Sequence, residues 1–360
     1  MNFFNKIIDF YATNKPFVVY RKPNENRIAG FFMNDNTLAY SKNFTEAGFV
    51  FAPFNGDEKA ILFPLENAEF ISEELIENDF NFDDTNFLVD EKAKENHINI
   101  VEKAIEEIKT SELQKVVISR KEDVQLSDFD LLKVYQKLLK KYKNAFVYVW
   151  FHPKVGLWLG ATPETLLQVS NANFKTMSLA GTQVAKEDAE FKSAEENTIV
   201  WKRKELEEQQ LVTDFIKNQL VTISSNLRID KTETIRAGNL LHLRTKVEGE
   251  LLEKADLKSL IRALHPTPAV CGLPRNMARD FIIKNEHYDR SFYTGFLGEL
   301  NIQDLKFNVQ SSQLYVNLRC MEINNKKASI YVGGGITKDS IAKNEWEETV
   351  SKSETMKKVL

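Results

Sequence analysis

Two predicted helices, far apart in the chain, carry carboxylates on the same side as their apolar residues, and this pattern most constrains the fold. The first helix is expected over about 188–220. At about 100° per residue, its apolar stripe consists of Leu211, Val212, Phe215, Ile216 and Leu220. Glu205 and Glu208 project onto that stripe, whereas Glu207 falls outside it.

The second helix is expected over about 339–357. Three apolar residues define its inward side, namely Ile341, Met356 and Val359. The charged residues on that side are Glu345, Glu348 and Lys352, and those outside it are Glu347 and Lys357.

A carboxylate on a buried side must be paired, hydrogen-bonded or bound to a metal, because burying a bare charge costs several kcal/mol. The two Glu-x-x-Glu pairs could therefore converge on one hard cation, and oxygen ligands of this kind suit Mg²⁺. The alternative is that all four are surface acids of a Glu-rich chain, with Glu348 and Lys352 forming a simple i,i+4 pair.

The rest of the chain alternates strands and helices in a pattern typical of an α+β layered fold. Strands are expected at 115–119, 145–151, 156–159, 164–169, 293–300, 313–322 and 328–333, with a strand pair around 241–251. Helices are expected over about 91–110 and, from a cap at Ser127 or Asp128, over 128–142. We expect a β-rich N-terminal portion, residues 1–95, to pack on a catalytic domain of residues 96–360.

Four further sites carry residues that could take part in catalysis or in substrate binding. The glycines at 333–335 follow a strand and precede a helix, so a turn there could bring backbone N–H groups to an anion. Lys115 lies in an apolar strand, where a desolvated lysine can act as a general base. Glu164 begins a strand, and a partly buried glutamic acid can stay protonated and act as a general acid. His242 could bind a substrate. Each site has an ordinary structural alternative. The glycines could form a plain turn, Lys115 could face solvent, Glu164 could be exposed in a turn, and His242 could be a hydrogen-bonded core residue.

Composition excludes several classes of protein. The 360 residues are 42% hydrophobic, which is enough for a large core. A net charge of −4 gives no basic excess for binding phosphate backbones, so we expect no nucleic-acid partner. Cys271 and Cys320 suggest neither a disulfide framework nor a zinc site. No apolar run approaches the roughly 20 residues that span a bilayer, so we expect a cytoplasmic protein without a membrane anchor.

Nine segments, in order over residues 110–355, resemble the chorismate-utilising enzymes. They include Lys-Val-Val-Ile-Ser-Arg at 115–120, Gly-Ala-Thr-Pro-Glu-Thr-Leu-Leu at 160–167, Gly-Gly-Gly-Ile at 333–336 and Glu-Trp-Glu-Glu-Thr at 345–349. The others lie at 178–182, 204–208, 264–275, 289–298 and 318–320. The resemblance implies two stacked antiparallel β-sheets flanked by helices, with the active site between the sheets.

The resemblance also implies roles for individual residues. Glu208 and Glu348 would bind Mg²⁺ directly, and Glu205 and Glu345 would bind it through water. The ion would hold the ring carboxylate of the substrate, chorismate. The substrate itself would be bound by Ala180, Gly181, Thr182, His242, Arg319, Gly334, Gly335 and Lys352. Gln209 departs from the family, since relatives often have histidine there.

Two positions separate the branches of this family. Ala180 stands where aminodeoxychorismate synthases usually place a nucleophilic lysine, which disfavours that branch. Lys115 is typical of the branches that use water. The resemblance therefore favours isochorismate synthesis, in which Lys115 takes a proton from the water that attacks C2 and Glu164 protonates the departing C4 hydroxyl.

Three alternatives stay open. Salicylate synthases share Lys115 and Glu164 and add pyruvate elimination, whereas anthranilate synthase component I uses ammonia and a glutaminase partner. An inactive chorismate-binding paralogue would keep the four glutamates without turnover. We expect Mg²⁺ as cofactor, a monomer, and no obligate amidotransferase subunit.

Overall fold

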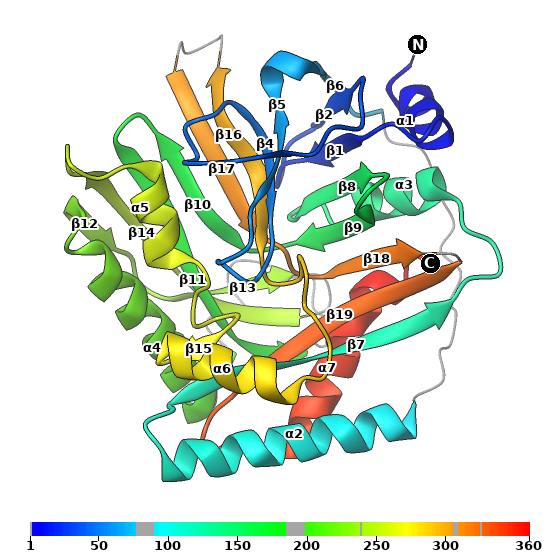
Figure 1. The fold of residues 1–360 in the computed structure, drawn as a ribbon. Helices are drawn as coiled ribbons and strands as arrows, with labels where there is room; N and C mark the ends of the chain where they lie inside the picture. Colours follow the sequence, from blue (N-terminus) through cyan, green and yellow to red (C-terminus); the bar gives the residue numbers. More distant parts are fainter. Residues whose placement is uncertain (1, 77–89, 185–198, 238–239, 305–308, 325) are drawn as a thin grey trace.

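Runs of β-branched and aromatic residues build two antiparallel sheets, which stack face to face with helices on their outer sides (Figure 1). The computed structural model describes residues 2–76, 90–184, 199–237, 240–304, 309–324 and 326–360. This architecture confirms the expected α+β fold of two stacked sheets.

Within the described residues, the first sheet has nine strands in the order β15-β7-β19-β18-β9-β8-β1-β2-β6. In that order their bounds are Gly272–Leu273, Lys115–Gln125, Lys327–Ile336, Cys320–Asn324, Gly156–Thr162, Phe146–His152, Phe17–Arg21, Arg27–Met33 and Ala68–Glu74.

The second sheet runs in the order β12-β14-β11-β10-β17-β16-β4-β5-β3, and β13 (Glu233–Ala237) also pairs with β14. The bounds of the ordered strands are Ser224–Ile229, Leu240–Leu251, Asn173–Val184, Thr165–Ser170, Val309–Val316, Phe296–Asp304, Gly48–Ala52, Ile61–Pro64 and Ala39–Tyr40. Strands β1–β6 thus extend both sheets, and the expected division after residue 95 stays a prediction.

Helices cover the outer faces of the two sheets. Those on the first sheet are α1 (Phe3–Ala12), α2 (Glu91–Thr110), α3 (Leu131–Lys141), α6 (Arg275–Asn285) and α7 (Ala342–Lys357). Those on the second are α4 (Arg203–Leu220) and α5 (Leu257–Leu264), and a short 3-10 turn, η1 (Leu65–Asn67), precedes β6. Among the described helices, none has the length and apolar character needed to cross a membrane.

Aromatic side chains fill much of the space between the sheets. Phe146 of the first sheet stacks on Tyr315 of the second, with ring centroids 4.2 Å apart. Phe51 and Phe292 stack at 4.1 Å, and Trp150 lies beside them. Each fully buried side chain of this size contributes about 1.5–3 kcal/mol of hydrophobic stabilisation. This rigid core holds the two sheets, and therefore the cavity between them, in place.

The structure confirms most predicted elements and corrects three boundaries. Asp130, rather than Ser127 or Asp128, caps α3 by accepting a hydrogen bond from the backbone N–H of Lys133 at 2.9 Å. The helix expected from about 188 begins only at Arg203, since 199–202 are not helical and 188–198 lie outside the described residues. The strand expected at 313–322 is two strands, interrupted at 317–319.

The buried imidazole of His97 makes the fold sensitive to acid. His97 lies on α2, is 2% exposed and packs its ring 5.8 Å from that of Trp346. Neither ring nitrogen has a hydrogen-bond partner within the described residues. Burial, with a smaller contribution from the positive charge of Arg120, lowers the pKa of His97 to about 3. Below about pH 6.5 the unfolded chain therefore binds a proton at His97 that the folded protein does not bind, so acid favours unfolding.

We expect His97→Phe to reduce the loss of stability between pH 7 and pH 5. In the wild type, His97 alone should lower the free energy of unfolding by on the order of 2 kcal/mol over this range. Urea unfolding of both proteins at the two pH values measures the difference, and His287→Gln, at an exposed histidine, is the control. Equal pH dependence in wild type and His97→Phe would show that His97 is not responsible.

Candidate active site

A narrow cavity between the two sheets collects most of the predicted site residues. Its volume is about 60 Å³. The site residues that line it are Glu164, Ala180, Gly181, Thr182, Glu208, His242, Arg319, Gly334, Gly335, Glu348 and Lys352. This volume holds about two water molecules, so the side chains around it must move apart before a ring-bearing substrate can enter.

The glycines at 333–335 lie within β19 rather than in a turn, which corrects the sequence prediction. Gly334 and Gly335 pair with Ile118 and Val117 of β7. A Cβ atom on Gly335 would lie 2.2 Å from Oε1 of Glu208 and 3.0 Å from Cε of Lys115. Gly335 is therefore needed because the Glu208 carboxylate and the end of Lys115 approach the strand here, not because the backbone turns.

Helix α4 brings Glu208 to Lys115 of β7. The Nζ of Lys115 lies 2.9 Å from Oε1 of Glu208, in an ion pair that lacks hydrogen-bond geometry. Lys115 is fully buried and Glu208 is 9% exposed, so neither is a solvent-facing side chain. Gln209 orients the helix, since its Nε2 donates to Ser178 Oγ at 2.8 Å and Thr245 Oγ1 at 3.0 Å on the second sheet.

Helix α7 contributes the second pair of glutamates. Glu345 is buried and pairs with Lys204 of α4, while Glu348 pairs with Lys352 at 2.6 Å. Lys352 also donates to the carbonyl oxygen of Gly333 at 3.0 Å. The helix is fixed to β7 by Arg120, whose Nε donates to Thr349 Oγ1 at 2.8 Å.

Two of the inward-side assignments on α7 are wrong. Ile341 is 61% exposed, because it precedes the first turn of the helix and follows no helical period. Lys357 is buried, because its Nζ reaches Glu122 of β7 at 2.6 Å. Glu347, by contrast, is exposed as predicted.

The lysines determine the charge state of these carboxylates. Burial opposes ionisation of Glu348, but the charge of Lys352 and its hydrogen bond outweigh burial and hold the pKa of Glu348 below its usual range. Burial raises the pKa of Glu345, against the opposing charge of Lys204. Of these two carboxyl groups, Glu348 is therefore the more readily ionised.

Glu164 faces the same cavity from the segment between β9 and β10. It is 3% exposed, and burial raises its pKa to about 8 although Lys115, Arg319 and Lys352 favour its ionised form. At neutral pH the side chain is therefore mostly a carboxylic acid. Such a group can donate a proton inside the cavity.

His242 and Arg319 also line the cavity. Burial, with the charges of Arg319 and Lys352, lowers the pKa of His242 to about 3, so its ring is neutral. Its Nδ1 lies 3.0 Å from the carbonyl oxygen of Gly181, which requires the proton on Nδ1. The Nε2 is then an acceptor, and a guanidinium nitrogen of Arg319 lies 3.4 Å from it.

Arg319 sits in the break between β17 and β18 with a left-handed backbone, φ 47°. A non-glycine residue in this region costs on the order of 1–3 kcal/mol, and such strain is found preferentially at functional sites. The interruption of the strand allows the guanidinium to lie in the cavity. In a continuous strand, successive side chains would point to opposite faces of the sheet.

The four glutamates offer the carboxylate oxygens that Mg²⁺ prefers. Glu205 fits such an ion most directly, because its Oε2 is buried without a partner among the described residues. The others are held by Lys115, Lys204 and Lys352, and in the part of the chain that the structure describes no three acidic, histidine or cysteine residues are grouped as metal ligands. The donor set therefore fits the ion in kind.

Comparison with known proteins decides the family. Residues 60–360 match the family model described as chorismate binding enzyme. The chain belongs to this family. Among curated relatives, isochorismate synthase MenF of Pasteurella multocida is 28% identical over 70% of this chain, and isochorismate synthase EntC of Escherichia coli K12 is 29% identical over 69%. The matched segments span 58% and 62% of those two proteins, or about three fifths of their length.

Solved structures of chorismate binding enzymes share the fold of the whole chain. DhbC of Bacillus anthracis has a TM-score of 0.81 at 24% identity and covers 99% of both chains. MenF of Escherichia coli, described as a menaquinone-specific isochorismate synthase, has a TM-score of 0.77 at 21% identity and covers 96% of this chain and 88% of that one. Anthranilate synthase component I of Streptococcus pneumoniae matches with a TM-score of 0.65, so the fold alone does not select a branch of the family.

Several functional contacts of this chorismate binding enzyme were not foreseen from its sequence. Lys204 pairs with Glu345, and Gln209 anchors α4. Arg290 is buried and donates to the carbonyl oxygens of Val117 at 2.7 Å and Val270 at 3.0 Å, both at the cavity. The Arg in the 289–298 segment was a signal for this contact, but its partners are distant in sequence.

We expect Gly335→Ala to damage the site more than the fold. The added methyl group must displace the Glu208 carboxylate and the end of Lys115, which are mobile ends of side chains rather than backbone. A misplacement of about 1 Å at a reacting group lowers activity about 10²-fold. Steady-state kinetics should show this loss, while thermal unfolding should change little.

A comparison at two other glycines sharpens this test. At Gly334 the nearest contact to an added Cβ is Glu348 Oε1 at an ordinary 3.4 Å, and at Gly56 the space is open. Gly334→Ala should therefore act more weakly than Gly335→Ala, and Gly56→Ala should have no effect. Equal activity in Gly335→Ala and Gly56→Ala would contradict the proposed crowding.

Proposed function

We propose that this protein is a Mg²⁺-dependent isochorismate synthase, which converts chorismate to isochorismate. The observation that carries the proposal is that Glu164 is buried and mostly protonated at the cavity next to cationic groups, and that the buried Lys115 pairs with Glu208, which lines the same cavity. The exchange of a C2 hydroxyl for a C4 hydroxyl needs one group that accepts a proton and one that donates a proton. The names of the curated relatives support the same activity.

Each residue has a role in the proposed reaction that follows from its position. Lys115 accepts a proton from water as the oxygen attacks C2, and Glu164 donates its proton to the departing C4 hydroxyl. Arg319 and Lys352 hold the substrate carboxylates. The Nε2 of His242 accepts a hydrogen bond, either from the substrate or from Arg319. The glutamates Glu205, Glu208, Glu345 and Glu348 would hold Mg²⁺, which supplies charge compensation for a substrate carboxylate.

The ion pair between Lys115 and Glu208 bears on this mechanism. Lys115 can accept a proton only as a neutral amine, whereas the ion pair needs its ammonium form. The two roles exclude one another, so Glu208 must be engaged elsewhere when Lys115 acts. A Mg²⁺ ion held by Glu208 would engage this carboxylate and would leave Lys115 without its ion-pair partner.

Incubation with chorismate and Mg²⁺, followed by HPLC, tests the proposed reaction. We expect isochorismate without salicylate or pyruvate. Salicylate and pyruvate would show a salicylate synthase, and an aminated product formed only with ammonia would show anthranilate synthase chemistry. A protein that binds chorismate without turning it over would be the inactive paralogue.

Removing the metal should abolish turnover, because the substrate carboxylate then lacks its counter-charge. Dialysis against EDTA and re-addition of Mg²⁺ test this in one protein sample. Calorimetric titration with Mg²⁺ should show binding that weakens in Glu208→Gln but not in Glu207→Gln, whose carboxylate pairs with Arg203 on the outer side of α4. Full activity after chelation would exclude the metal.

A further inference from the structure

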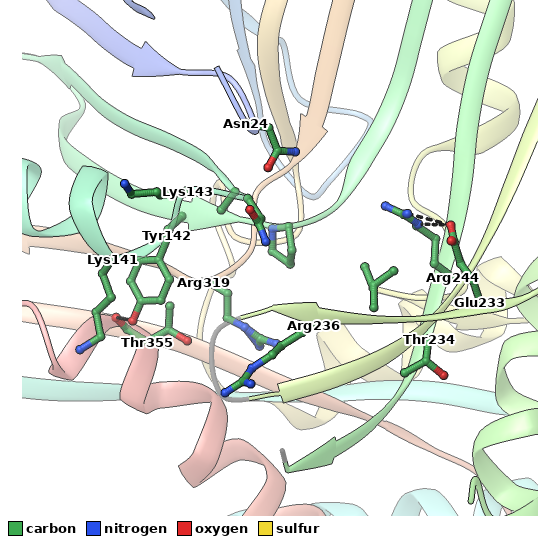
Figure 2. A pocket seen from close by; sticks show the side chains of 15 residues that line it. Asn24, Lys141, Tyr142, Lys143, Glu233, Thr234, Arg236, Arg244, Arg319 and Thr355 are labelled. Carbon is green, nitrogen blue, oxygen red and sulfur yellow. Dashed lines mark hydrogen bonds and ion pairs between the residues drawn. The ribbon is translucent and has the colours of Figure 1, made fainter. Parts of the chain in front are cut away.

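Arg319 occupies a position from which its side chain borders two cavities. It lines the narrow cavity together with the proposed site residues, and it also lines a second cavity of about 610 Å³. Figure 2 shows its side chain among those that border this larger space. An arginine side chain has many rotamers, so the larger cavity gives the guanidinium group room to leave the narrow one. Where the guanidinium lies therefore depends on how firmly the backbone of Arg319 is held.

Asn317, two residues earlier in the chain, holds that backbone. It is fully buried and lies in the same interruption between β17 and β18 as Arg319. Its backbone N–H donates to the carbonyl oxygen of Gly295 at 2.8 Å, and its carbonyl oxygen accepts from the N–H of Thr294 at 2.8 Å. Its Nδ2 donates to the carbonyl oxygen of Phe292 at 2.9 Å. Asn317 thus joins the interrupted strand to a segment whose Thr294 also lines the narrow cavity.

Tyr148 of β8 binds the remaining polar atom of the Asn317 side chain. The Tyr148 hydroxyl donates to Asn317 Oδ1 at 2.6 Å, and Tyr148 is itself fully buried. Strand β9 lies between β8 and β18 in the sheet, and the Tyr148 ring crosses it at Gly160. A Cβ atom on Gly160 would lie 2.6 Å from this ring and 3.1 Å from Cys320 Cβ, so a larger residue would push the ring away. The tyrosine therefore reaches the interruption from two strands away.

We propose that Tyr148 and Asn317 are positioning residues, which set the affinity for the substrate by holding the backbone of Arg319 so that its guanidinium lies in the narrow cavity. That the bound group is a carboxylate of chorismate rests on the proposed function. The described lining of the narrow cavity includes neither residue, so both act through Arg319 rather than on the substrate. The left-handed backbone of Arg319, φ 47°, needs such support, because strained backbone persists only where the surrounding structure over-determines it.

Tyr148→Phe tests the proposal by removing a single hydroxyl group. We expect KM for chorismate to rise about tenfold, the size of one hydrogen bond. The value of kcat should stay within about threefold of the wild type, because a loosened carboxylate-binding group weakens the binding of substrate and transition state alike.

Tyr20→Phe is the matched control. Tyr20 lies opposite Tyr148 on the neighbouring strand β1, is 1% exposed, and donates its hydroxyl hydrogen to Glu299. It is not among the described residues that line either cavity. Tyr20→Phe should lower the thermal stability but leave KM unchanged. An unchanged KM in Tyr148→Phe, or an equal rise in both variants, would overturn the positioning role.

A double-mutant cycle shows whether Tyr148 acts through Arg319. In an Arg319→Met background the guanidinium is absent, so Tyr148→Phe should no longer change the affinity for chorismate. A further tenfold loss in that background would show that Tyr148 acts by another route and would overturn the proposal. Calorimetric titration with chorismate measures the dissociation constants of the four proteins without relying on turnover.

Failure of the proposed function would leave a different trace. It would appear as absence of isochorismate in the wild type, while the dissociation constant for chorismate would still rise in Tyr148→Phe. Failure of the positioning role would appear as normal isochorismate formation with a KM that is insensitive to Tyr148. A wild-type protein that binds no chorismate would overturn both.

Discussion

Replacement of Lys115 by methionine is expected to lower kcat of the proposed reaction by about 10²–10⁴, the range contributed by a positioned general base. Methionine is close to lysine in length and fills the buried space on β7, but it cannot accept a proton. Chorismate should still bind, since Arg319 and Lys352 remain. Stopped or continuous assays of turnover, combined with calorimetric binding of chorismate, measure the two effects separately.

The outward-facing lysine of the same strand gives a matched control. Lys121 is exposed, so Lys121→Met removes the same charge without entering the cavity. It should retain wild-type kcat. If Lys115→Met kept turnover within a few-fold of the wild type, Lys115 would have no part in proton transfer, whatever its position.

Replacement of Glu164 by glutamine should cost a similar 10²–10⁴ in kcat, because the amide cannot donate an acidic proton to the leaving hydroxyl. The wild-type rate should also depend on pH. Because the protonated form is the active one and burial raises its pKa to about 8, kcat should fall as the pH rises through about 8. In Glu164→Gln the residual rate should lack this decline.

Stability provides a second readout for Glu164. The folded state holds its proton to about pH 8, whereas the unfolded chain releases it near pH 4.5, so this group stabilises the fold at low pH and that contribution is lost as the pH rises through 8. Glu164→Gln should therefore show less loss of stability between pH 6 and pH 9 than the wild type. Urea unfolding across this range measures it.

A second carboxyl group with a raised pKa serves as the control. Burial raises the pKa of Glu322 on β18, but Glu322 does not line the narrow cavity. Glu322→Gln should keep both the wild-type kcat and its decline near pH 8. If the decline persisted in Glu164→Gln, another group would be responsible for it.

The helical carboxylates show what local sequence can predict. Glu208 and Glu345 are buried as expected, because the period of an α-helix follows from its own geometry and the apolar stripe identifies the inward side. The prediction was wrong at Ile341, which is exposed because it precedes the first turn of the helix. It was also wrong at Lys357, which is buried because it pairs with Glu122, a residue distant in sequence. Periodicity carries no information about either.

The glycines at 333–335 show the opposite case. Consecutive glycines next to a helix indicate a turn by local rules, yet they lie in a strand paired with β7. The small size of Gly335 matters because Glu208 and Lys115 approach it from other parts of the chain. A close approach between distant segments leaves no local signal in the sequence.

The sequence by itself determined the α+β class, the inward carboxylates of α4 and α7, and, through ordered motifs, the family. These follow from short-range periodicity and from residues kept in order along one chain. Only the tertiary structure decided which lysine neutralises which glutamate and where Arg319 breaks its strand. The reason is physical: charge pairing, burial and cavity shape depend on distances between segments that the backbone brings together only after the two sheets have packed.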